Sequence, residues 1–199
     1  MPDKEKHFMK FQKNLEWATK NMDQYYFRIA MAKSRGHFLR ERVYCYELYH
    51  LLRLGLQCFP YTLQGEMDKI GHPIFRREIG AVKPDFILHE QGTMENNLAV
   101  MEVKSLNNTN GSQLKKDLNT LTRFLDLGYY RAIHLIYGSL SRDDGGISKI
   151  IRTYREYMIP TRLLNAYRGK LLLYWHKTSG EHAIIYDWES EVLNNSNDR

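Results

Sequence analysis

The first apolar pattern along the chain is a narrow stripe that recurs at helical spacing between residues 7 and 30. Its members alternate spacings of three and four residues, and they are Phe8, Phe11, Leu15, Ala18, Met22, Tyr25 and Ile29. A helix with so narrow an apolar seam either docks on the body of its own domain or pairs with a copy of itself. The sequence therefore predicts an N-terminal amphipathic helix within residues 1–36, and it leaves open a homodimer through residues 8–29.

After residue 36 the apolar pattern switches between helical and strand spacing. Helical spacing predicts helices at about 41–54, 112–127 and 147–158. Apolar runs between glycines and polar loops predict strands at about 61–70, 73–79, 82–89, 98–104, 131–137, 171–176 and 182–188. Gly55 and Pro60 end the first of these helices, and Ser112 is the expected N-cap of the second. This order of elements predicts an α/β (α+β) fold in which helices flank a mixed sheet.

The composition is typical of a globular protein that builds its own core, with 43% hydrophobic and 26% charged residues among 199. We expect one domain over residues 37–199, with its core at 41–138 and a C-terminal extension at 139–199. No apolar run approaches the ~20 residues of a membrane span. Cys45 and Cys58 have no CxxC spacing, and no secretory signal precedes them. We therefore expect two buried thiols in a cytoplasmic protein that does not bind membranes.

The chain is basic, with a net charge of +6, and the excess is densest between Lys10 and Arg53. A basic surface attracts polyanions because each neutralised phosphate releases counterions. The charge alone fits either a nucleic acid partner or a solvated basic face.

Candidate chemistry lies in the stretch KPDFILHEQGTMENNLAVMEVKS, residues 83–105. Because side chains alternate along a strand, Glu102 and Lys104 share one face of the sheet. Asp85 opens the preceding strand, and the turn between the strands can set it beside Glu102. An exposed cross-strand ion pair, which contributes about a few tenths of a kcal/mol, is the simple alternative. However, LAVMEVK is apolar on both faces up to Met101, as in a covered central strand, where charges are costly to bury.

A further acid, Glu47, stands in the predicted helix at 41–54. Val43, Leu51 and Leu54 form a stripe, and position 47 is its missing member. Glu47 is therefore either paired with a neighbour such as Arg53 or His50, or directed toward Asp85 and Glu102.

Three acids and a lysine suit metal-assisted hydrolysis. Oxygen ligands favour Mg²⁺ or Mn²⁺, which bind through one or two carboxylates and keep waters and substrate phosphates in their other positions. Such an ion activates water and neutralises charge on a phosphoryl group, and Lys104 can stabilise the anionic transition state. No GxSxG, phosphate-binding loop or GxGxxG motif indicates another chemistry.

Pro84-Asp85 stands in one predicted strand and Glu102-Val103-Lys104 in the next, between a helix that carries an acid and a further helix and strand. In this order of features, residues 41–138, about half of the chain, resemble the PD-(D/E)xK nuclease superfamily with its restriction-endonuclease-like core. The resemblance implies that Asp85 and Glu102 are metal ligands, with the Val103 carbonyl as a third. It also implies that Lys104 is the catalytic lysine and that Glu47 is the helix carboxylate of the site.

Some members of the superfamily carry a Gln followed four residues later by Tyr in the next helix. Here Gln113 is followed at that spacing by Asp117, so this extra motif is absent. Gln113, Lys115 and Lys116 remain candidate nucleic acid contacts, with a solvated helix face as the alternative.

Other polar residues of the sequence each have two possible roles. Glu66 and Asp68 either support the site or pair with Lys69 and Arg76. Three histidines could line a cleft, but none has metal-motif spacing: they are His72, His89 and His134.

The sequence thus predicts a Mg²⁺- or Mn²⁺-dependent nuclease that acts on DNA, as an endonuclease of a restriction, defence or repair type. Two alternatives stay open. One is a nuclease-like subunit that binds nucleic acid without cutting it, and the other is an interaction protein organised by the seam at residues 8–29.

Overall fold

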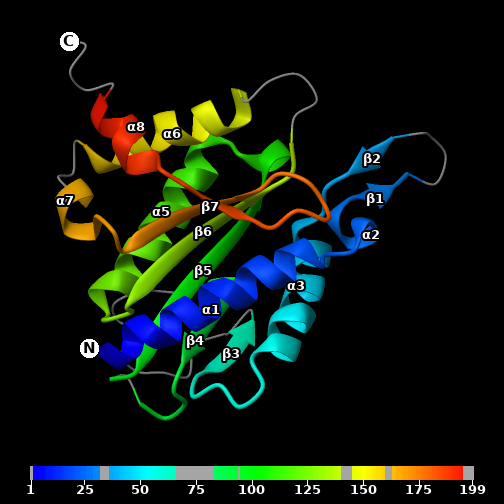
Figure 1. The fold of residues 1–199 in the computed structure, drawn as a ribbon. Helices are drawn as coiled ribbons and strands as arrows, with labels where there is room; N and C mark the ends of the chain where they lie inside the picture. Colours follow the sequence, from blue (N-terminus) through cyan, green and yellow to red (C-terminus); the bar gives the residue numbers. More distant parts are fainter. Residues whose placement is uncertain are drawn as a thin grey trace.

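The computed structural model describes residues 2–31, 36–65, 83–93, 95–139, 145–159 and 163–194. Figure 1 shows a central sheet between two layers of helices. The helices are α1 (Pro2–Lys20), α2 (Gln24–Phe27), α3 (Glu41–Gly55), α5 (Gly111–Asp126), α6 (Gly145–Met158), α7 (Leu163–Tyr167) and α8 (Trp188–Asn194). The strands are β1 (Ile29–Ala30), β2 (His37–Phe38), β3 (Thr62–Gly65), β4 (Phe86–His89), β5 (Asn97–Ser105), β6 (Arg131–Tyr137), β7 (Leu171–His176) and β8 (Ile184–Tyr186). The expected mixed α/β class is confirmed.

In the described part of the chain, six strands form the main sheet in the order β3-β4-β5-β6-β7-β8. β3, β4 and β5 are antiparallel, β5, β6 and β7 run parallel, and β8 returns antiparallel to β7. The predicted strands at 98–104, 131–137 and 171–176 are confirmed to within one residue. The predicted strand at 182–188 is shorter, because α8 already begins at Trp188. The predicted strand at 73–79 lies outside the described residues.

β5 is the covered central strand that its apolar sequence predicts, and eight of its nine residues are buried. Met101 and Val103 belong to the core shared with α1 and α3, whereas Val100 belongs to the core shared with α5 and α6. This alternation directs Glu102 and Lys104 toward the α5 side of the sheet. The last residue pair between β4 and β5 is Phe86 with Met101, whereas β6 accompanies β5 as far as Ser105. β5 therefore extends beyond β4.

The apolar seam of the N-terminal helix packs on its own domain. Phe8, Phe11, Leu15, Ala18 and Met22 are all buried in the core that also contains residues of α3 and β5. Of the two alternatives, docking on its own domain is therefore confirmed, and the seam is buried rather than available to a second copy. The predicted helix is too long, because α1 ends at Lys20 and Asp23 caps the separate short helix α2. Tyr25 consequently leaves the seam and is 71% exposed.

Two local expectations are wrong. Asn110, rather than Ser112, is the N-cap of α5, where its side chain accepts a hydrogen bond from the Gln113 N–H. Cys45 is buried as expected, but Cys58 is exposed. It lies in the turn after α3 and has a positive φ of 58°, in the left-handed region that residues other than glycine rarely adopt.

Within the described ranges, no helix combines the length and the apolar character that crossing a membrane requires.

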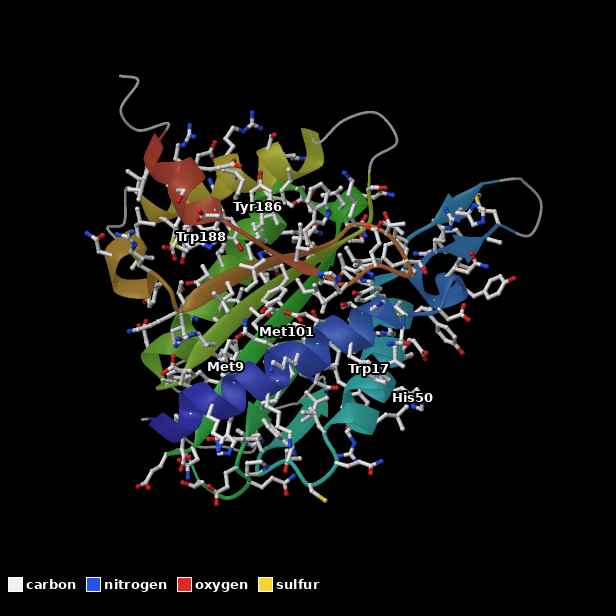
Figure 2. All side chains as sticks on the ribbon, in the orientation of Figure 1. Met9, Trp17, His50, Met101, Tyr186 and Trp188 are labelled. Atoms are coloured by element: carbon white, nitrogen blue, oxygen red, sulfur yellow. The ribbon has the colours of Figure 1, made fainter. Side chains whose placement is uncertain are left out.

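The docking of α1 can be tested by comparing two positions on its opposite sides. Figure 2 shows Met9 on the side of α1 that faces away from the sheet, and Met9 is 54% exposed whereas Phe11 is fully buried. Phe11→Ala should lower the free energy of unfolding by about 3–5 kcal/mol, because it leaves a cavity in the core. Met9→Ala should change it by less than about 0.5 kcal/mol. Denaturant unfolding followed by circular dichroism measures both, and equal losses would contradict this packing.

Candidate active site

The candidate site is built on the part of β5 that extends beyond β4. Successive N–H groups of a strand point to alternate sides, so the N–H groups of Val103 and Ser105 point to the same side. Asp85 Oδ2 accepts the Val103 N–H at 2.7 Å, and Glu41 Oε2 accepts the Ser105 N–H at 3.1 Å. Two carboxylates therefore replace the strand partner that β4 no longer provides.

Lys104 is held between two acids from different helices. Its Nζ lies 3.1 Å from Glu41 Oε1 at the start of α3 and 3.6 Å from Asp117 Oδ2 on α5. Burial acts to lower the pKa of Lys104, but Asp117 and Glu41 outweigh it, so the pKa lies above its ordinary value. Lys104 is therefore a fixed ammonium at neutral pH, with only 15% of its side chain exposed.

Asp85 and Glu102 form a close carboxyl pair next to this ammonium. Burial raises the pKa of Asp85 to about 6, although the Val103 N–H and Lys104 act in the opposite direction. Burial, and then repulsion from Asp85 and Asp117, holds the pKa of Glu102 well above its ordinary value. A side-chain hydrogen bond with Asp85 further favours the protonated form of Glu102, so Asp85 makes the ionisation of Glu102 more difficult. A cation placed between them would remove that repulsion.

Asp117 extends the site into the layer of α5 and α6. Burial raises its pKa, and its Oδ2 makes no hydrogen bond within the described part of the chain. The same oxygen lies 3.9 Å from Nε2 of His134, whose Nδ1 is 2.9 Å from the Tyr154 hydroxyl. Burial, and then Lys104, lowers the pKa of His134 to about 3, so its ring is neutral. His134 and Tyr154 therefore form a neutral, buried support behind Asp117.

The structure places Glu41, not Glu47, at Lys104. The buried side of α3 consists of Tyr44, Cys45, Leu48, Leu51 and Leu52, and Leu54 is 48% exposed. The expected stripe through positions 43, 47, 51 and 54 is therefore wrong. In the described residues, no hydrogen bond or ion pair joins Glu47 to Asp85, Glu102 or Lys104. At ~100° of turn per residue, positions 41 and 47 lie about 120° apart around the helix.

The remaining candidates lie outside this cluster. Gln113, Lys115 and Lys116 are exposed on α5, and Lys115 pairs with Glu156 at 3.4 Å. His89, at the far end of β4 from Asp85, contacts Gln64 Oε1 at 2.6 Å. Glu66, Asp68 and His72 lie outside the described residues.

The sequence did not predict Glu41 or Asp117 as site residues, and only Asp117 stands out in the sequence pattern. Asp117 interrupts the apolar stripe of α5, three residues after Leu114 and four before Leu121. An acid in such a position indicates a buried partner. Glu41 is an acid in the first turn of a helix, where acids are common for dipole reasons alone.

The donor set fits a hard divalent cation. In the part of the chain that the structure describes, no group of three or more His, Cys, Asp and Glu side chains is arranged to hold a metal ion. Mg²⁺, however, commonly binds through only one or two protein carboxylates. Asp85 and Glu102 provide such a pair, and the buried Asp117 Oδ2 lies in the same cluster without a hydrogen bond from any described residue.

Comparison with protein-family models, with curated proteins and with solved structures found no match to this chain.

Removing the charge of Asp85 should stabilise the metal-free protein. The pKa of Asp85 rises from 3.8 to about 6 on folding, so the free energy of unfolding falls as pH rises through that range. Asn is neutral at every pH and its side-chain oxygen can still accept the Val103 N–H. Asp85→Asn should therefore raise the free energy of unfolding by about 1–3 kcal/mol at pH 8 in EDTA.

Below about pH 3, where the Asp85 carboxyl is largely protonated in both the folded and the unfolded state, the stabilisation by Asp85→Asn should largely disappear. Thermal and urea unfolding at both pH values measure it, with the exposed Asp3→Asn as a matched control. A loss of stability at pH 8 would contradict the raised pKa of Asp85 in the folded protein.

Proposed function

We propose that this protein is a divalent-metal-dependent nuclease that hydrolyses phosphodiester bonds in DNA. The observation that carries the proposal is the adjacent pair of buried carboxyls, Asp85 and Glu102, whose pKa values are both raised, beside the fixed ammonium of Lys104. Stability alone does not favour such a cluster, since burying like charges is costly. Such a cluster is instead expected at a site that binds a cation and a phosphate anion, because groups with strongly shifted pKa values are common at functional sites.

The arrangement of elements supports a restriction-endonuclease-like core. α3 precedes the antiparallel strands β3, β4 and β5, and α5 then leads to β6 parallel to β5. Asp85 directly precedes β4 and Glu102-Val103-Lys104 lies on the neighbouring strand β5, in the order that the resemblance to the superfamily implies.

Each residue of the site has a distinct part in the proposed reaction. Asp85, Glu102 and the Val103 carbonyl would hold Mg²⁺ or Mn²⁺, which supplies an acidic bound water and neutralises charge on the phosphate. Lys104 directs its ammonium at the scissile phosphate and stabilises charge that develops there. Glu41 and Asp117 keep Lys104 protonated and fix its position.

Cleavage assays on supercoiled plasmid, linear duplex, single-stranded DNA and structured RNA test the proposal. With Mg²⁺ or Mn²⁺, the protein should cut DNA, and EDTA should abolish cleavage. Lys104→Met should lower the rate by at least about 100-fold, because it removes the positive charge and keeps the length of the side chain. Thermal unfolding of the variant shows whether it is folded. Salt-sensitive DNA binding without cleavage under any condition would instead support a nuclease-like binding subunit.

A second pair of variants tests which helix carboxylate belongs to the site. Glu41→Gln should lower the cleavage rate by about 10- to 100-fold, because Lys104 loses its closest anion while the Ser105 N–H keeps an acceptor. Glu47→Gln, on the same helix, should leave the rate within about twofold. Steady-state rates at saturating metal compare the two, and the reverse order of effects would restore Glu47 as the site carboxylate.

A further inference from the structure

A groove of about 310 Å³ opens directly beside the carboxyl pair. It is lined by Cys45, Tyr46, Tyr49, Gly65, Asp85 and Phe86. It therefore lies between α3 and the strands β3 and β4, which run beside each other in Figure 1. Because Asp85 forms part of its wall, any group bound in the groove lies next to the candidate site.

The two tyrosines of the groove differ in how they are held. The Tyr49 ring stacks on Phe86, with an interplanar angle of 10° and ring centroids 6.3 Å apart, and its hydroxyl donates to the Leu63 carbonyl at 3.4 Å. The Tyr46 side chain is 61% exposed. Tyr49 is therefore a fixed wall, and Tyr46 presents an aromatic ring to whatever enters the groove.

Two arginines continue the same side of α3. Arg42, Tyr46, Tyr49 and Arg53 are spaced four, three and four residues apart, so they share one side of the helix. Arg42 and Arg53 are both exposed. A groove with aromatic walls, on a side of α3 that also carries two exposed arginines, matches the chemistry of single-stranded nucleic acid, whose bases stack on aromatic rings and whose phosphates attract Arg.

We propose that this groove binds an unpaired nucleobase of a DNA strand, stacked on Tyr46, while Arg42 and Arg53 contact flanking phosphates. The inference rests on the proposed nuclease function and names its substrate class: single-stranded DNA, or DNA with an unpaired segment at the cleavage point. In a duplex, both faces of each base are covered by its neighbours, so the groove would have no base to receive.

Exposure of an aromatic ring does not by itself carry this proposal. Tyr25 and Trp17 are also exposed, at 71% and 44%. Neither lines the groove. Tyr46 differs from them because its ring, the groove and the Asp85 carboxyl are contiguous.

Binding of fluorescently labelled single-stranded and duplex DNA in EDTA, measured by anisotropy, tests the proposal without any need for cleavage. Tyr46→Ala should weaken binding of the single strand by about 5- to 100-fold, as expected for the loss of one base-stacking contact. Tyr46→Phe should restore it, because the ring remains. Duplex binding should change by less than twofold, and Tyr25→Ala is the matched control for an exposed tyrosine outside the groove.

A crosslinking measurement adds a readout that depends on stacking. Single-stranded DNA carrying 5-iodouracil should crosslink on irradiation to Tyr46, as mapped by mass spectrometry. Crosslinks only elsewhere, or an equal effect of Tyr46→Ala on single-stranded and duplex DNA, would overturn the proposal. Tyr46-dependent binding without metal-dependent cleavage would reject the nuclease function and keep the groove. Cleavage of duplex DNA that Tyr46→Ala does not affect would reject the groove and keep the nuclease function.

Discussion

The candidate site depends on one backbone constraint, which is that β5 continues past the end of its neighbour β4. The N–H groups of Val103 and Ser105 would otherwise lack partners, and leaving a buried N–H unpaired costs about 1–3 kcal/mol. Asp85 and Glu41 accept these two hydrogen bonds. Asp85 thereby anchors the residues before β4 to this end of β5. Glu41 anchors the first turn of α3 to the same end. The same two side chains, Asp85 and Glu41, therefore satisfy the backbone of β5 and bring negative charge close to Lys104.

This arrangement concentrates negative charge in a buried place. Burial and repulsion among the acids raise the pKa of Asp85, Glu102 and Asp117, and the ammonium of Lys104 lies among them. The metal-free protein is therefore less stable at neutral pH than it would be with neutral side chains in these positions. Such a conflict between stability and local charge is typical of sites that bind a cation or carry out chemistry.

The layers around β5 explain how a charged cluster can exist in so apolar a strand. α1 and α3 cover one face, where Met101 and Val103 contribute to a continuous apolar core. Glu102 and Lys104 point to the other face, where Asp117 and His134 provide polar neighbours. The polar network is therefore confined to one end of the sheet, where Glu41 also reaches Lys104 from α3. α1 contributes to this separation although none of its residues lies in the cluster.

The sequence by itself determined the central covered strand, the shared face of Glu102 and Lys104, and the closeness of Asp85 to Glu102. Each depends on the two-residue alternation of a strand and on a short connection, both of which are local. Only the tertiary structure decided that Glu41 rather than Glu47 reaches Lys104, and that Asp117 joins them. Those outcomes depend on the rotation of α3 and α5 about their axes and on how far β5 extends beyond β4. The end of α1 could likewise not be predicted from the sequence, since the apolar spacing continues to Ile29 whereas Asp23 caps a new helix. Local spacing determines which residues share a face of one element, but packing between elements determines which faces meet.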